Sequence, residues 1–365
     1  QNFYAVARTH ILQHLALHLA NAASFTSTIK TFAVKTKATS VTFQQSFDVV
    51  PVVVALASNQ GGDPSALRIR NITLTGFEIA ALEPPGNDGP HAAMTFHYVA
   101  IEPGVYTMPG GNVIAAGTHT TSALQASGVV SGAKSWDTVS FGAALPSSAA
   151  VTASLQTMNS ESGTIPSGPS QPWLSVAVRN PSTTSAQMAI ERSEVAAGTL
   201  SAETIGWIAF PSARSGSFVG VLGGSIGWEA RQSADSIVGW DNGCTAHTFS
   251  GTSWANARVV ATKNRRDGSD GGWLRRCSLS GTQVGLVMDE DLANDTERAH
   301  TTESAGIVAF SDSFHAVFNG QISAAKTVAL ISDPIHGASG AYALPGALMR
   351  YTIAAQSSGN SPIDS

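Results

Sequence analysis

The sequence predicts an all-β protein of three tandem antiparallel β-sandwich modules, with a short N-terminal helix and C-terminal extension strands. Apolar residues recur at every second or third position over much of the chain, as in strands with one buried face, and turns such as Pro-Pro-Gly-Asn-Asp-Gly at 84–89 separate them. Charged residues make up only 12% of the chain, about half the globular average. A short apolar segment with an alanine at the same place recurs about every 100 residues, at 97–101, 206–210 and 306–310.

The repeat extends upstream of these three segments. When their alanines are aligned, the second and third copies carry a glutamate six residues earlier, Glu203 and Glu303, where the first carries Met94. The first and third copies carry a histidine nine residues earlier, His91 and His300. Each copy also opens on a similar short segment, so beginnings, ends and spacing agree and indicate a three-fold repeat. The chain is then divided into an N-terminal amphipathic helix (1–24), three modules (25–118, 119–220 and 221–322) and a C-terminal β extension (323–365).

The N-terminal segment differs from the rest of the chain. Residues 1–23 contain no glycine or proline and are rich in leucine and alanine, which predicts the one substantial helix. Ala20-Asn21-Ala22 resembles a signal-peptidase site and Arg8 an n-region charge, so a signal remnant is the alternative. We favour a retained amphipathic helix that docks on its own chain or on a neighbouring subunit. No stretch reaches the roughly 20 apolar residues of a membrane span.

Three histidines lie on one face of this predicted helix. His10, His14 and His18 have the spacing at which histidines can hold zinc. No nearby carboxylate or cysteine completes a ligand shell, so we favour a solvated or interface face over a metal site.

The first copy supplies a family resemblance. The segments NITLTGFEIAALEP (71–84) and HAAMTFHYVAIEPG (91–104) resemble the H-type lectin-like module of bacterial secreted and surface proteins. In that pattern a Gly-Phe strand is followed by an H-x-x-E-T segment and a W-I-A-[IF] strand. The first copy lacks the glutamate, the second lacks the histidine and the third lacks the tryptophan. The resemblance covers roughly residues 41–320 and implies antiparallel β-sandwiches; animal members with this fold bind sugars as trimers.

A second resemblance concerns the C-terminal extension. Residues 332–337 and 343–353 resemble the opening strands of the Ig-like repeats that follow such modules in bacterial surface proteins. A complete Ig-like sandwich would need about 60 more residues. Because an unpaired strand edge invites association, we expect these strands to pair with the third module, or with a neighbouring subunit by strand addition.

Motifs of catalysis and of nucleic-acid binding are weak. Residues 223–227 match G-x-S-x-G, but no helical pattern follows, as a nucleophile elbow requires. No H-E-x-x-H, C-x-x-C or phosphate-loop motif occurs. The net charge is −5 and basic residues are not concentrated, which argues against nucleic acid as a partner. We therefore expect no enzymatic activity.

Both cysteines, Cys244 and Cys277, fall in the third module. An even number within one module permits a disulfide, and two unpaired thiols are the alternative. We favour the disulfide because the chain has the composition of an extracellular protein.

The third module is also the most charged of the three. The segments 267–272 and 289–297 offer oxygen ligands for calcium, but they lack EF-hand spacing. We favour solvated loops and predict no cofactor, with calcium as the alternative.

If the modules bind a sugar, the recurring polar positions are the candidates. Carboxylates accept hydrogen bonds from sugar hydroxyls, although Glu203 and Glu303 recur inside the framework motif, which favours a structural role. The candidate ligand-binding residues are His91, Glu203, Arg298, His300 and Glu303.

The resemblance and the low charge together predict an extracellular or cell-surface, non-enzymatic adhesive protein. Its partners would be surface glycans or neighbouring copies of itself. The alternative is the structural subunit of an extracellular bacterial filament, a homo-polymer assembled through its terminal helix and C-terminal strands.

Overall fold

A computed structural model describes residues 22–31, 38–88, 91–126, 135–161, 173–192, 200–250, 253–292, 296–319, 322–339 and 347–357. These residues form 24 strands and one short 3-10 turn, η1 (Trp240–Asn242). The prediction of an all-β, antiparallel fold is confirmed. The predicted helix falls mostly on residues 1–21, outside the described residues. Residues 22–24 belong to a strand, so a helix reaching residue 24 is wrong at its last three positions.

Three sheets have four strands each. The first has the order β22-β1-β6-β3 (Phe314–Asn319, Ala22–Thr31, Thr95–Ile101 and Val52–Ala57). The second has the order β11-β14-β8-β7 (Ala149–Leu155, Glu203–Pro211, Val113–Thr121 and Gly104–Thr107). The third has the order β15-β16-β21-β18 (Arg214–Val219, Ser225–Gln232, Ala305–Phe310 and Arg258–Lys263).

Three further sheets have three strands each. Their orders are β2-β5-β4 (Thr39–Thr42, Gly76–Leu82 and Ala66–Arg70), β10-β13-β12 (Asp137–Ser140, Ser185–Arg192 and Leu174–Arg179) and β17-β20-β19 (Thr245–Thr248, Gln283–Asp289 and Trp273–Leu279). The short β9 (Leu124–Gln125) pairs with β13 in the parallel direction. The last sheet has two strands, β23 (Ile322–Ser332) and β24 (Leu348–Ser357).

Each four-stranded sheet packs on a three-stranded sheet through its own apolar cluster. In the first pair, Val41, Ile69 and Phe77 of the three-stranded sheet lie against Val53 and Tyr98 of the other sheet. The rings of Phe77 and Tyr98 meet edge to face with their centroids 5.0 Å apart. Comparable clusters lie between the sheets of the second and third pairs. Alternation along each strand explains this packing, because alternate side chains point to opposite faces.

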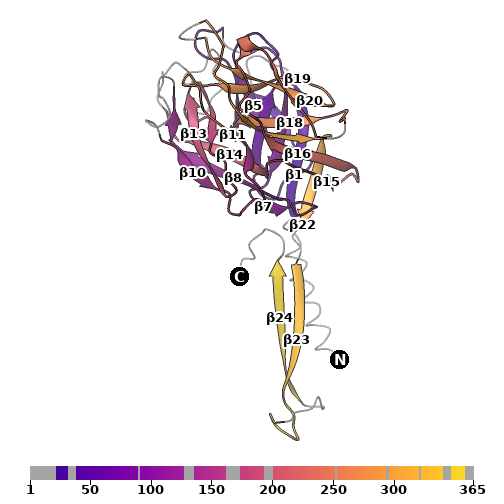
Figure 1. The fold of residues 1–365 in the computed structure, drawn as a ribbon. Helices are drawn as coiled ribbons and strands as arrows, with labels where there is room; N and C mark the ends of the chain where they lie inside the picture. The colour runs from indigo at the N-terminus through magenta and orange to yellow at the C-terminus, as the bar shows by residue number, and fades with distance from the viewer. Residues whose placement is uncertain are drawn as a thin grey trace. The chain divides into compact units, whose positions relative to one another are not determined.

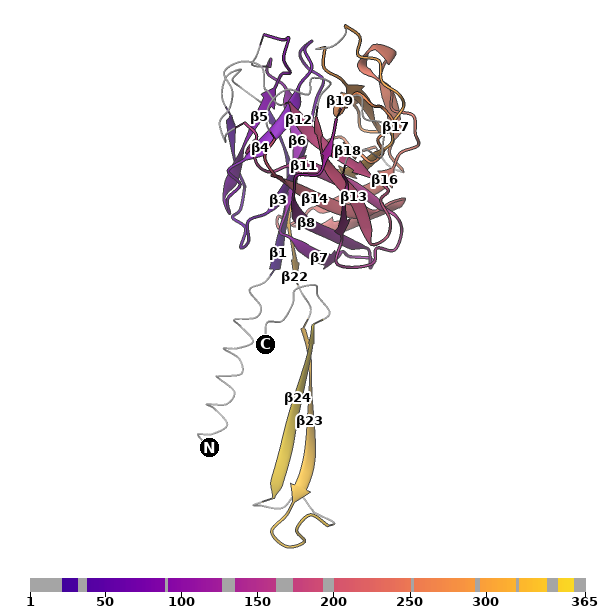
Figure 2. The same ribbon diagram turned by 90° about the vertical axis from the view of Figure 1, so that its left-hand side faces the viewer.

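The three four-stranded sheets also share one core on their other faces. Val54 of the first sheet, Phe210 of the second and Phe310 of the third all belong to it. The ring centroids of Phe210 and Phe310 are 6.2 Å apart. Figures 1 and 2 show strands of all three sheets gathered in the body formed by residues 23–318, which is one compact unit. Strands with two buried faces therefore read as continuous apolar runs, as in β3.

The alanines on which the sequence repeat is aligned occupy matching places in the hydrogen-bonded ladders. Ala100 lies opposite Val53, Ala209 opposite Val151, and Ala309 opposite Val259. The three valines stand on β3, β11 and β18, each at the edge of its four-stranded sheet.

Side chains from a neighbouring sheet pair with the backbone of these three edges. Gln156 accepts from the Val53 amide at 2.9 Å and donates to its carbonyl at 2.7 Å. Asn264 does the same for Val151, at 2.9 and 2.8 Å. Unpaired strand edges favour aggregation, and these contacts cover them with the neighbouring sheet.

The third edge is covered by a histidine. Nδ1 of His97, on β6, accepts from the Val259 amide at 2.9 Å, so the ring must be neutral. Burial, with Arg276 and Arg258 nearby, lowers the pKa of His97 to about 2. The unfolded chain takes up this proton near pH 6.5 and the folded chain only near pH 2, so stability is present above pH 6.5 and falls as the pH falls.

We expect this histidine to contribute measurably to acid sensitivity. Between pH 6.5 and 5, His97 should remove up to about 2 kcal/mol from the free energy of unfolding. Urea unfolding of the wild type and of His97→Gln at both pH values isolates this contribution, since other groups titrate alike in both. Equal pH dependence of the two proteins would contradict a neutral His97.

The chain passes from one four-stranded sheet to the next at equivalent places. β7 follows β6 but joins the second sheet, and β15 follows β14 but joins the third sheet. β22 follows β21 and joins the first sheet, where it pairs with β1. The two strands lie close together in both views (Figures 1 and 2). The third four-stranded sheet is thus connected back to the first through β22.

This path differs from the sequence division at residue 118, which falls inside β8. Strand β7 and the first half of β8 belong to the sheet of β11 and β14, although they precede that division. The three-module organisation itself stays a prediction.

The β23–β24 hairpin belongs to a unit separate from residues 23–318. Its register runs from Ile322 opposite Ser357 to Ser332 opposite Leu348, with an irregularity between Leu330 and Ser332. Within the described residues this sheet has two strands only. Among those residues there is also no helix with the length and apolar character needed to cross a membrane.

Candidate functional site

Glu203, one of the predicted site residues, holds the loop that follows β11. Its carboxylate accepts from the backbone amides of Asn159 and Ser160, at 3.2 and 2.8 Å. Arg68 of β4 lies 3.3 Å from it and 2.7 Å from Glu161. Burial alone would raise the pKa of Glu203, but Arg68 and these hydrogen bonds outweigh it and lower the pKa. The carboxylate therefore stays ionised and joins the first and second pairs of sheets.

Glu303 plays the same part in the third pair of sheets. It accepts from the amides of Asp267 and Gly268 at 2.9 and 3.2 Å. The ring of His300 lies between Glu303 and Glu290 and contacts both. Burial would lower the pKa of His300, but the hydrogen bonds to the two carboxylates outweigh it and raise the pKa. A Cβ on Gly268 would lie 2.3 Å from this ring, so glycine is required there for packing.

Arg298 belongs to a buried ion cluster. Its Nε lies 2.8 Å from Asp289, and Arg275 reaches the same carboxylate at 2.7 Å. Both arginines stack near the ring of Trp240, at 4.0 and 5.2 Å from its centroid. They also donate to carbonyls of the loop that follows β3, including that of Gly62. The cluster therefore joins the third pair of sheets to the first.

His91 packs on the same loop. Nδ1 contacts the Ala92 carbonyl at 2.8 Å and Nε2 the Asp63 carbonyl at 3.0 Å. Burial lowers the pKa of His91 despite these carbonyls. A Cβ on Gly61 would lie 2.5 Å from the ring, which parallels Gly268 and His300.

The structure thus places all five predicted residues in internal contacts and exposes none of them by more than 8%. It brings His300 and Glu303 together, places both Arg298 and His91 against the loop that follows β3, and places Glu203 between the first and second pairs of sheets. A ligand would have to displace contacts that hold loops and join sheets.

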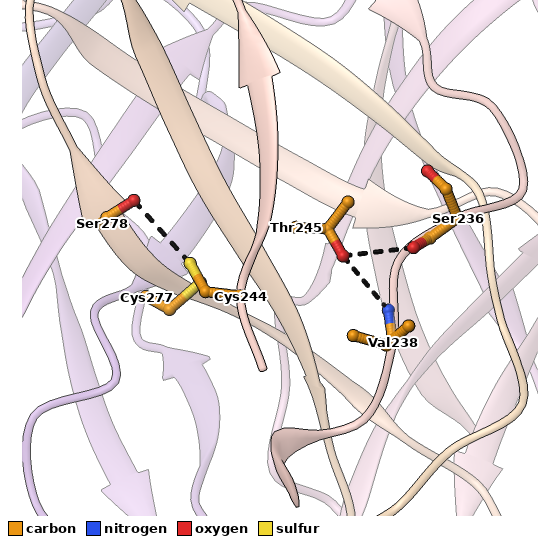
Figure 3. Close-up of a disulfide and its surroundings, with 6 residues drawn as sticks. All are labelled: Ser236, Val238, Cys244, Thr245, Cys277 and Ser278. Atoms are coloured by element: carbon orange, nitrogen blue, oxygen red, sulfur yellow. Dashed lines mark hydrogen bonds between the residues drawn. A yellow bond between two sulfur atoms is a disulfide. The ribbon is translucent and has the colours of Figure 1, made fainter. Parts of the chain in front are cut away.

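Cys244 and Cys277 form a disulfide, with their Cα atoms 6.0 Å apart. Cys277 stands at the irregularity between Arg276 and Ser278 in β19, and Cys244 precedes β17 (Figure 3). Next to it, Thr245 donates to the Ser236 carbonyl at 3.1 Å. The bridge links the two outer strands of the three-stranded sheet across β20.

We expect the disulfide to stabilise the third pair of sheets. The cysteines are 33 residues apart, and closing a loop of this length should contribute roughly 3 kcal/mol by restricting the unfolded chain. The double variant Cys244→Ser/Cys277→Ser should lose that amount in urea unfolding. Reducing agent should lower the wild type equally and leave the double variant unchanged; a variant as stable as wild type would contradict the estimate.

The weaker sequence motifs have simple structural contexts. Ser225 of the G-x-S-x-G match begins β16 and pairs with Val219, so the turn leads into a strand. Asp267 and Asp289 of the acidic segments pair with arginines. Another acidic group, Asp63, Glu83 and Asp88, has its carboxylate oxygens within 4.8 Å of one another. Asp63 comes from the β3–β4 loop, whereas Glu83 and Asp88 both come from the β5–β6 loop, so spacing in the sequence did not reveal the group.

A polar hollow lies where the second pair of sheets meets the third. It has a volume of about 560 Å³. Four segments line it: the β12–β13 turn, the end of β16 with the loop that follows it, the loop after β18 and the residue before β21. The charged and amide side chains at its wall are those of Arg179, Asn180, Gln232, Asp235, Asn264, Arg265, Arg266 and Asp267.

Two of its three arginines are paired with carboxylates. Arg265, half exposed, lies 2.6 Å from Asp267 and 3.3 Å from Asp235. Arg266 is buried and lies 2.8 Å from Glu191. Arg179 has another environment: its Nε donates to the Gln187 amide oxygen at 2.9 Å, and its guanidinium lies over the ring of Trp136 at 4.3 Å.

The sequence did not single out this hollow, because its residues come from distant segments. Neither the scan against family models nor the searches of curated proteins and of solved structures found a match to this chain. The function is therefore argued from the residues themselves.

Proposed function

We propose that residues 23–318 form a non-enzymatic, extracellular or cell-surface unit that binds glycans. We further propose that its three pairs of sheets are three lectin-like modules, of the H-type lectin-like kind that the first repeat resembles. The matching ladder positions of Ala100, Ala209 and Ala309 support the three-fold reading. The observation that carries the binding function is the polar hollow.

The lining of this hollow suits a sugar better than an apolar ligand. Guanidinium, amide and carboxylate groups converge there, and sugars present hydroxyls that both donate and accept hydrogen bonds. Its volume falls in the range of small-molecule sites, about 300–1,000 Å³. We place the ligand here rather than at His91, Glu203, Arg298, His300 or Glu303, because those side chains already serve internal contacts.

A glycan array probed with the intact chain tests the function. We expect binding to a defined set of saccharides, and Arg265→Ala should weaken it by tenfold or more because this side chain lies half exposed at the hollow. Arg214→Ala is the control, since Arg214 is exposed at the start of β15 and does not line the hollow. A blank array from a folded protein would reject the proposal.

Assembly into a filament is the second candidate. The β23–β24 sheet favours it: among the described residues it has two strands, and a two-stranded sheet is marginal in water and gains stability from a further strand or surface. A neighbouring copy would then supply the partner by strand addition. Electron microscopy should show filaments that disappear when residues 340–365 are deleted; uniformly monomeric particles would reject this candidate.

A further inference from the structure

The β4–β5 and β12–β13 turns have the same construction. In the first, Arg70 Nε and Asn71 Nδ2 donate to Glu78 at 2.8 and 3.1 Å. In the second, Arg179 Nε and Asn180 Nδ2 donate to Gln187 at 2.9 and 3.0 Å. Both asparagines have a positive φ, 49° and 50°. The two turns are therefore equivalent sites that differ in one acceptor.

That difference removes a negative charge. Arg70 pairs with the carboxylate of Glu78, whereas the described partners of Arg179, Gln187 and the Trp136 ring, are both neutral. Burial and the like charge of Arg266 lower the pKa of Arg179. The first turn demonstrates that the fold accepts a carboxylate at this position.

Arg179 also faces the hollow. Its Nε donates to Gln187, so among the described contacts its two Nη groups remain available as donors, and Arg265 and Arg266 line the same hollow. A guanidinium binds carboxylate and sulfate groups through two parallel hydrogen bonds, and such bonds are stronger when both groups are charged.

We infer that the hollow selects an acidic saccharide, whose carboxylate or sulfate group binds Arg179. This group would supply the negative charge that Glu78 supplies to Arg70 in the first turn. This inference rests on the proposed glycan-binding function and names its ligand class. Gln187 acts as a specificity-determining residue, since its neutral amide positions Arg179 without neutralising it.

The test measures dissociation constants of the full chain for three probes: a sulfated chondroitin tetrasaccharide, neutral chitotetraose and inorganic sulfate. We expect the acidic tetrasaccharide to bind at least tenfold more tightly than either of the others. Arg179→Ala and Gln187→Glu should each weaken the acidic probe by tenfold or more and leave the neutral one unchanged. Gln187→Glu recreates the pairing of Arg70 with Glu78, so its fold should be retained, as a thermal melt can verify.

Glu78→Gln is the matched control, because it makes the same exchange at a turn outside the hollow and should leave both affinities unchanged. Equal binding of acidic and neutral probes, or unchanged binding by Gln187→Glu, would overturn the inference while the glycan-binding function stands. Sulfate alone binding as tightly as the tetrasaccharide would also overturn it, in favour of a free-anion site. A folded chain that binds no saccharide on the array fails the broader proposal instead.

Discussion

Replacing Asp289 by asparagine is expected to lower the free energy of unfolding by about 3–5 kcal/mol, because removing one member of a buried ion cluster leaves the others uncompensated. Asp289 is fully buried, and Arg275 and Arg298 both pair with it. The substitution keeps the side-chain shape and removes only the charge, so two buried cations would lose their counter-ion. Urea unfolding at neutral pH measures the loss.

Asp312→Asn is the matched control. Asp312 lies 3.6 Å from Arg258, and its side chain is 47% exposed. Solvent screens such a pair, so the expected loss is about 1 kcal/mol or less. If Asp289→Asn cost no more than this control, the cluster would not join the third pair of sheets to the first.

The second large effect is expected for Phe314→Ala, at the start of β22. Phe314 is 5% exposed and belongs to the core shared by the three four-stranded sheets. Its ring centroid lies 4.9 Å from those of both Phe218 and Phe310. Truncating a buried phenylalanine removes apolar contacts and leaves a cavity, which typically costs about 3–5 kcal/mol.

The position of β22 makes this loss informative. Because β22 connects the end of residues 23–318 back to the first sheet, its packing should stabilise all three sheets together. Val317→Ala in the same strand is the control, since Val317 is 38% exposed and should contribute only about 0.5 kcal/mol. A single cooperative transition at a lower denaturant concentration is expected for Phe314→Ala. Separate transitions, or a loss no greater than the control, would contradict the role of β22.

Local periodicity revealed much of this architecture. Alternating apolar residues and turn sequences predict the strands, because the faces that a strand buries set its pattern of apolar residues. The recurring alanines mark equivalent positions in the hydrogen-bonded ladders. The recurrence of Glu203 and Glu303 also had physical meaning. Each holds backbone amides of a loop, the structural role that the sequence favoured.

Contacts between distant segments could not be read in this way. Gln156, Asn264 and His97 cover three equivalent strand edges with different side chains, so no shared motif marks them. The hollow draws on four separate segments for the same reason. The sequence did hold one indication of the site, because aligning the two turns places Gln187 where the first turn has Glu78. The loss of this carboxylate gains a meaning only when the structure shows Arg179 at the hollow.

The most direct measurement is a crystal structure of the chain with the sulfated tetrasaccharide bound. We predict a sulfate or carboxylate oxygen within hydrogen-bonding distance of the Arg179 guanidinium, with the sugar in the hollow beside Arg265. A saccharide bound at another surface, or one in the hollow whose acidic group points away from Arg179, would contradict the account.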